Sequence, residues 1–95
     1  MKLKYKIEIP PKVGVLGNKT TIVRVYEDRT IITLLYWTGN KESLDYRRVR
    51  VLGTAHTTLV AVLQACRKTG KPMEQAIDDA YLTQLIRRAG WMHFN

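Results

Sequence analysis

The chain has a single cysteine, Cys66, and no long uncharged hydrophobic run. One cysteine excludes an internal disulfide. Because Cys66 lies in an apolar segment, we expect it to be a small core residue in a reducing compartment. The N-terminus carries charge but lacks the apolar segment of a signal peptide. The longest uncharged stretch, residues 51–66, is too short and too polar to cross a bilayer. These absences predict a cytoplasmic protein with no membrane partner.

Signatures of catalysis and of metal binding are missing as well. The sequence has no glycine-rich phosphate loop, no nucleophile elbow and no redox pair of cysteines. Its two histidines, His56 and His93, lie far apart, and neither has a cysteine or carboxylate at ligand spacing. We expect His56 on the surface, in the first turn of a helix. The sequence therefore predicts a protein that is not an enzyme and that needs no metal, cofactor or small-molecule substrate.

Acidic residues are scarce, with 8 Asp and Glu against 16 Lys and Arg, for a net charge of +8. Residues 1–53 hold eleven basic and five acidic side chains, a net of +6, and residues 54–95 hold five and three, a net of +2. This excess favours an anionic partner, either nucleic acid or an acidic protein surface. The alternative is a charge that only keeps the protein in solution. Three acids, Glu74, Asp78 and Asp79, fall in the first half of a predicted helix, where they favour the helix dipole.

Hydrophobic patterning predicts four strands in the first half of the chain. Residues 2–9 alternate polar and apolar, which is the period of a half-buried strand. The segments 20–27 and 30–38 are rich in β-branched and other apolar residues, and the turn residues Gly39 and Asn40 follow them. The segment 43–52 changes the phase of its alternation near Arg47 and Arg48, so we expect a β-bulge there.

The apolar period becomes helical after Gly53. We expect a first helix with Thr54 as its N-cap, with Leu59 and Leu63 facing the sheet, and with Gly70 ending it. A second helix should run from Pro72 to the stop at Gly90. The order β-β-β-β-α-α predicts one α+β domain over residues 1–95. Its antiparallel sheet of about four strands carries two helices on one face.

Basic side chains of the predicted sheet are the best candidates for a binding site. Lys2, Lys4 and Lys6 share one strand face, and Arg48 and Arg50 are likewise two residues apart. Arg24 and Tyr26 share a face that could supply a phosphate contact and a stacking surface. The predicted set is Lys2, Lys4, Lys6, Arg24, Tyr26, Arg47, Arg48 and Arg50. The alternative is a solvated sheet edge whose lysines discourage other chains from pairing with it.

A large apolar tail follows Gly90. It includes Trp91 and Phe94, two large aromatic side chains that would favour aggregation if they were exposed to water. We expect this tail either to cover its own domain or to anchor a partner.

Three antiparallel strands that lead into a helix with the sequence Thr57-Thr58-Leu59-Val60-Ala61-Val62-Leu63-Gln64-Ala65 resemble the first half of an RNase H-like domain. The resemblance extends over about half of the chain. It implies a sheet followed by a covering helix. Those nucleases need an acidic residue on this helix, and the chain has none between Ala55 and Lys68, so the resemblance implies an inactive relative and assigns no site residue.

The sequence thus predicts a small basic protein that binds nucleic acid through phosphates on its sheet half, with little sequence specificity. A second hypothesis is a protein-binding inhibitor or adaptor of a nucleic-acid-processing complex. Anti-CRISPR-type proteins of phages and mobile elements have a similar size and a similar lack of motifs. Composition leaves the choice between DNA and RNA open, and also the oligomeric state.

Overall fold

The computed structural model describes residues 2–9, 20–37 and 44–89, without the side chains of residues 36, 37, 44–47 and 79. The apolar tail with Trp91 and Phe94 lies outside the described residues.

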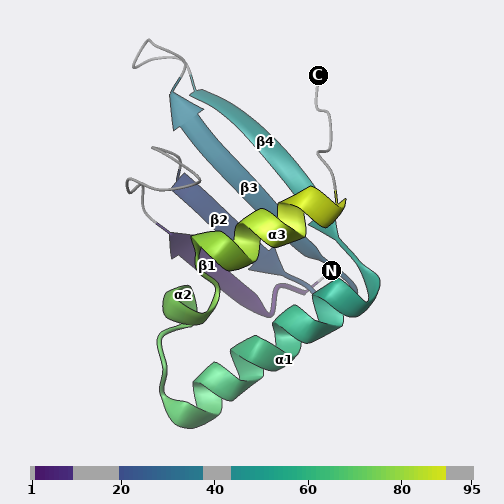
Figure 1. Cartoon of the computed structure of the whole chain (residues 1–95), viewed down its shortest axis with the longest axis vertical. Coiled ribbons are helices and arrows are strands. Elements are labelled where there is room, and N and C mark those ends of the chain that lie inside the picture. Colours follow the sequence, from purple (N-terminus) through teal and green to yellow (C-terminus); the bar gives the residue numbers. More distant parts are fainter. Residues whose placement is uncertain (1, 10–19, 38–43, 90–95) are drawn as a thin grey trace.

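A four-stranded antiparallel sheet precedes the helices, as the sequence predicts, and the α+β class is confirmed (Figure 1). The strands follow one another in space in the order β1-β2-β3-β4, so each connection joins neighbouring strands. Their bounds are β1 (Tyr5–Ile9), β2 (Thr20–Val25), β3 (Thr30–Trp37) and β4 (Leu44–Val51). The helices are α1 (Gly53–Thr69), α2 (Met73–Ala76) and α3 (Asp79–Ala89).

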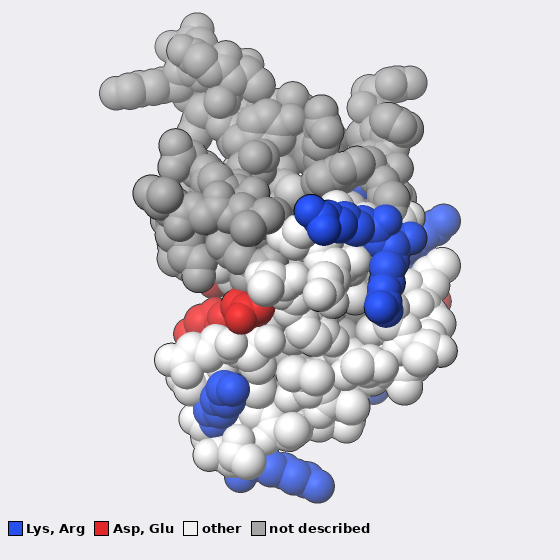
Figure 2. Space-filling model, viewed as in Figure 1, with Lys and Arg blue, Asp and Glu red and all other residues white. Residues whose placement is uncertain are grey.

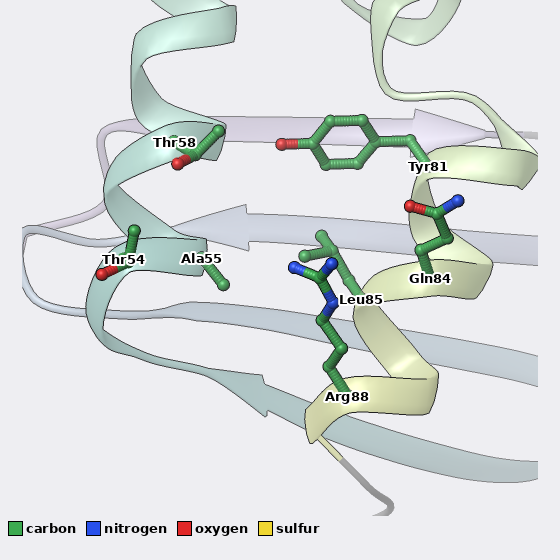
Figure 3. A pocket seen from close by; sticks show the side chains of 7 residues that line it. All are labelled: Thr54, Ala55, Thr58, Tyr81, Gln84, Leu85 and Arg88. Carbon is green, nitrogen blue, oxygen red and sulfur yellow. The ribbon is translucent and has the colours of Figure 1, made fainter.

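Alternate side chains of each strand form one hydrophobic core with the helices. Val23, Ile32 and Val49 are fully buried on the sheet side, and Leu59 and Leu63 are fully buried on α1. The predicted inward face of α1 is therefore confirmed. Both long helices lie on this one side of the sheet, with their axes across the strands (Figures 1 and 3). The opposite side of the sheet is covered by none of the described helices.

The prediction of a bulge in the fourth strand is wrong. β4 pairs with β3 without interruption, from Leu44 opposite Trp37 to Val51 opposite Thr30. The sequence changes phase because the sheet face away from the helices is itself partly apolar. Ile22 is buried there, and Leu35 is half-buried. Apolar residues in the first half of β4 therefore need not share a face with the core valines of its second half.

The expected single second helix is divided into α2 and α3. Ile77 ends α2 with a non-helical backbone, at φ −99° and ψ 71°, and its side chain is fully buried. Oδ1 of Asp78 then accepts a hydrogen bond from the N–H of Tyr81 at 2.9 Å, which is the contact of an N-cap. Burial of Ile77 and capping by Asp78 thus outweigh the continuous helical period of the sequence.

The first helix begins earlier than expected. Leu52, not Thr54, is the N-cap residue, and it makes no side-chain capping hydrogen bond. Gly53 has φ 60°, a left-handed value that lets the chain turn from β4 directly into α1. Gly70 ends α1 as predicted, with φ 77° and an N–H bond to the carbonyl of Cys66. Cys66 is a free, buried cysteine, which confirms its assignment to the core.

The expectation of a surface position for His56 is wrong. The residue is only 6% exposed, because its ring packs between α1 and the turn that joins β2 to β3. Both ring nitrogens lie within hydrogen-bonding distance of atoms from that region, so burial leaves neither without a partner.

Candidate nucleic-acid interface

Three cations lie in one row across the sheet. Lys6 of β1 is opposite Arg24 of β2, Arg24 is opposite Ile31 of β3, and Ile31 is opposite Arg50 of β4. Neighbouring strands are about 4.8 Å apart, so the row spans about 14 Å from Lys6 to Arg50. Residues that are distant in the sequence thus form one line of positive charge.

This row lies on the side of the sheet away from the helices. Successive side chains of a strand point to opposite faces. The neighbours of Arg24, Val23 and Val25, are fully buried in the core, and the neighbours of Arg50, Val49 and Val51, are buried there as well. Arg24 and Arg50 must therefore point the other way.

Two more predicted cations extend the same surface. Lys4 precedes β1 and donates its N–H to the carbonyl of Val25 at 2.8 Å, which continues the pairing by one residue. Arg48 lies opposite Thr33, two positions before Arg50 in β4. We call this surface the basic face and define it by Lys4, Lys6, Arg24, Arg48 and Arg50.

The centre of the basic face is buried. The row next to the cations contains Glu8, Ile22, Thr33 and Arg48 in adjacent strands. Ile22 and Thr33 are buried, whereas Glu8 is exposed. The Thr33 hydroxyl has no hydrogen-bond partner in the described part of the chain. Among the described strand residues of this face, Glu8 is the only carboxylate, so positive charge prevails on it.

The remaining predicted site residues are less well placed. Lys2 is exposed but lies before β1, outside the paired strands. Tyr26 follows β2, is half-buried, and donates its N–H to the carbonyl of Arg29. Arg47 pairs with Leu34 in the β3–β4 ladder, and its side chain is not among the described ones.

The helix side has a different charge distribution (Figure 2). Basic side chains gather there at the end of α3, which carries Arg87 and Arg88, and at the end of α1, which carries Arg67 and Lys68. Between them lies a largely uncharged surface. Among the described side chains, the cations of the helix side therefore gather at the ends of these two helices, in contrast to the row on the basic face.

A cavity of about 250 Å³ opens between α1 and α3 (Figure 3). The Tyr81 side chain extends from α3 toward Thr58 of α1, and Arg88 extends from the last turn of α3 alongside Leu85. Burial raises the pKa of the Tyr81 phenol above its usual value, because the phenolate loses hydration there. The hydroxyl thus keeps its proton and can donate a hydrogen bond.

The sequence offered no signal for this cavity. Its walls come from two helices that are separated by α2, and the spacing of residues along either helix does not show which faces meet. The basic face was partly predictable, because alternation within each strand indicates which cations share a side.

Residues 2–9, 20–37 and 44–89 contain neither a metal-binding cluster nor a membrane-spanning helix. No group of three or more His, Cys, Asp or Glu side chains in these ranges could hold a metal ion. No helix in the same ranges combines the length and the apolar character needed to cross a bilayer.

Comparison with known proteins gives no relative, since no family model, no curated protein and no solved structure matches this chain. The resemblance to an RNase H-like domain stays a prediction from the sequence. In the structure, β4 stands between the third strand and α1.

Proposed function

We propose that this protein binds nucleic acid through phosphate contacts on the basic face. The observation that carries the proposal is the row formed by Lys6 of β1, Arg24 of β2 and Arg50 of β4, in which Ile31 of β3 stands between the two arginines. Lys and Arg side chains bind phosphate oxygens without reading bases, and such contacts dominate nonspecific affinity. Arg48 and Lys4 add charge beside the row, and Glu8 opposes it with a single carboxylate.

The dimensions of the row suit a short stretch of one strand. A length of about 14 Å corresponds to about four nucleotides at the 3.4 Å axial spacing of a strand in a duplex, and to fewer nucleotides of an extended single strand. A contact of this size gives weak binding, with a dissociation constant on the order of 10⁻⁴–10⁻⁶ M at physiological salt.

The apolar side chains within the basic face favour a single strand over a duplex. Ile31 stands between Arg24 and Arg50 in the row, and Ile31 and Leu35 are both half-buried. Unpaired bases can lie on such a surface while their phosphates contact the cations. In a duplex the bases are enclosed, so the exposed part of these apolar groups would stay in water.

The test replaces the three cations of the row with uncharged glutamine. Lys6→Gln, Arg24→Gln and Arg50→Gln are combined in one variant, and its binding to a labelled single strand of about 12 nucleotides is followed by fluorescence anisotropy at several salt concentrations. Lys6 and Arg50 are exposed and Arg24 is half-buried, and a thermal melt establishes that the variant is folded. We expect weaker binding, and we expect the salt slope to fall by up to about 0.7 for each phosphate that the variant no longer neutralises.

A matched control removes the same charge elsewhere. Arg67→Gln, Lys68→Gln and Lys71→Gln change three exposed cations around the end of α1, on the helix side. This control should keep most of the affinity of the unchanged protein. An equal loss of affinity in both variants would show that net charge, rather than the basic face, governs binding, and the proposal would then be wrong.

An acidic protein surface is the second candidate ligand. The half-buried apolar side chains Ile31 and Leu35 among the cations would also suit a protein interface, whose centre excludes water. In this case the protein acts as an inhibitor or adaptor of a nucleic-acid-processing complex. Recovery of partners from a cell lysate with and without nuclease separates the two candidates. A discrete protein that stays bound after nuclease treatment, and that the triple variant of the row fails to recover, supports the second.

A further inference from the structure

The cavity between α1 and α3 combines an apolar floor with a polar rim. Ala55 and Leu85 supply the floor, and Thr54, Thr58 and Gln84 lie around it (Figure 3). Tyr81 reaches across one end with its ring, and Arg88 brings a guanidinium to the other end. A ligand that fits this arrangement has a flat apolar part and an anionic group.

The charge of the cavity is entirely positive. Among the described residues that line it there is no carboxylate, and Arg88 is exposed and bears a full charge. α1 has no acidic residue in its first turn and no side-chain cap. Thr54 and Ala55 line the cavity, so the positive end of the α1 dipole adds to the charge of Arg88. A phosphomonoester carries more negative charge than a carboxylate, so Arg88 and the α1 dipole together attract it more strongly.

A second chamber adjoins the cavity at the end of β4. This chamber measures about 240 Å³ and shares Ala55, Leu85 and Arg88 with the first. Arg50 lines only the second chamber, and it is also the last cation of the row on the basic face. β4 is an edge strand, so the second chamber lies where the helix side and the basic face meet. Arg50 of the row and Arg88 of α3 thus both line this second chamber.

We propose that the α1–α3 cavity holds the phosphorylated terminal nucleotide of a nucleic-acid strand that lies on the basic face. This inference rests on the function proposed above. Arg88 pairs with two oxygens of the terminal phosphate, and the hydroxyl of Thr54 donates a further hydrogen bond to it. The terminal base lies against the Tyr81 ring and Leu85, and the Tyr81 hydroxyl and Gln84 are available to its polar edge.

The size of the cavity limits the ligand to one nucleotide. Binding sites for drug-sized molecules occupy about 300–1,000 Å³, and each chamber here is below that range. The rest of the strand must then leave past Arg50, which leads it over the β4 edge toward Arg24 and Lys6.

The experiment compares single strands of identical sequence that differ only at their ends. One strand has hydroxyl groups at both ends, one has a 5′ phosphate, and one has a 3′ phosphate. We expect one of the two phosphorylated strands to bind at least about tenfold more tightly than the unphosphorylated strand, because a single charge-assisted hydrogen bond to the terminal phosphate already contributes about that factor. Fluorescence anisotropy gives the affinities. Amide NMR shifts at Thr58 and Gln84 report whether the end lies in the cavity.

Variants assign the preference to the cavity. Arg88→Gln should remove the preference for a terminal phosphate, and Arg87→Gln, an exposed cation of the same helical turn that lines neither chamber, should keep it. The double variant Lys6→Gln and Arg24→Gln should weaken the binding of all strands and leave the preference intact. Thermal melts establish that each variant is folded.

Several outcomes would overturn the inference. If all three strands bind equally well to the unchanged protein, the cavity holds no terminal phosphate, although nucleic-acid binding by the basic face still stands. If Arg87→Gln and Arg88→Gln reduce the preference to the same degree, the effect comes from local charge and not from the cavity. If no strand binds, the proposed function fails together with this inference. Binding of a free nucleoside monophosphate in the cavity without any binding of strands would likewise contradict it.

Discussion

The hydroxyl oxygen of Thr30, on β3, lies 2.9 Å from Nδ1 of His56 in the first turn of α1. Nε2 of the same ring lies 3.1 Å from the carbonyl oxygen of Glu27. A carbonyl oxygen can only accept, so Nε2 carries a proton and donates it. In the neutral ring Nδ1 then accepts from the Thr30 hydroxyl. One side chain thus joins α1 to the strand and the turn at this end of the sheet.

Replacing this histidine should weaken the whole domain. His56→Ala leaves the Thr30 hydroxyl and the Glu27 carbonyl without their partner, which should lower the free energy of unfolding by roughly 1–3 kcal/mol. Urea denaturation measures the change. Gln64→Ala, at an exposed position of the same helix, is the control and should change stability by less than about 0.5 kcal/mol. Equal stability of the two variants would contradict a joining role for His56.

The packing of α1 on the core can be tested at Leu63. This side chain is fully buried in the cluster shared by the helices and the sheet. Leu63→Ala should therefore cost on the order of 2–5 kcal/mol, because it removes buried apolar surface and leaves a cavity behind. The adjacent Val62 is only half-buried, so Val62→Ala should cost less. A loss below about 0.5 kcal/mol for Leu63→Ala would mean that this face of α1 does not support the core.

Asp78 should matter as a cap and not as an acid. Asp78→Ala removes the oxygen that accepts the Tyr81 N–H, and we expect a loss of about 0.5–2 kcal/mol. Asp78→Ser retains a capping oxygen without the charge and should recover most of that loss. Thermal denaturation measures the loss of stability in each of the two variants. Equal destabilisation in both would point to the carboxylate charge at the helix dipole in place of the hydrogen bond.

The apolar tail gives a prediction from sequence that the described residues do not test. Deleting residues 91–95 removes Trp91 and Phe94, and we expect a lower melting temperature of the monomer, because so short a chain needs its large side chains to complete its core. If the tail instead anchors a partner, deletion should leave the melting temperature unchanged and abolish self-association or partner binding. No effect on stability, oligomeric state or binding would rule out both roles.

The order of elements was readable from the sequence because it depends on local patterns. Alternation along residues 5–9 and the β-branched segments after it predict strands. The helical period that starts near Gly53 predicts α1, and Gly70 ends it because glycine adopts a left-handed backbone at little cost. The same alternation predicted that Arg48 and Arg50 would share a face, and the β3–β4 ladder bears this out.

Which distant residues meet depends on the folded chain as a whole. The row of Lys6, Arg24 and Arg50 depends on the register between strands, and a shift of one residue would have put these cations on the opposite face. The helix ends at Ile77 because this side chain is buried in the core, which the helical period of the sequence does not show. His56 is buried because its ring bonds Thr30 of β3, which is distant in the sequence.

The cavity between Tyr81 and Thr58 exists because two helices pack side by side on one sheet. Local sequence determines the elements through short-range sterics and hydrophobic period. Contacts between elements depend on how their side chains fill shared space, and no single segment contains that information.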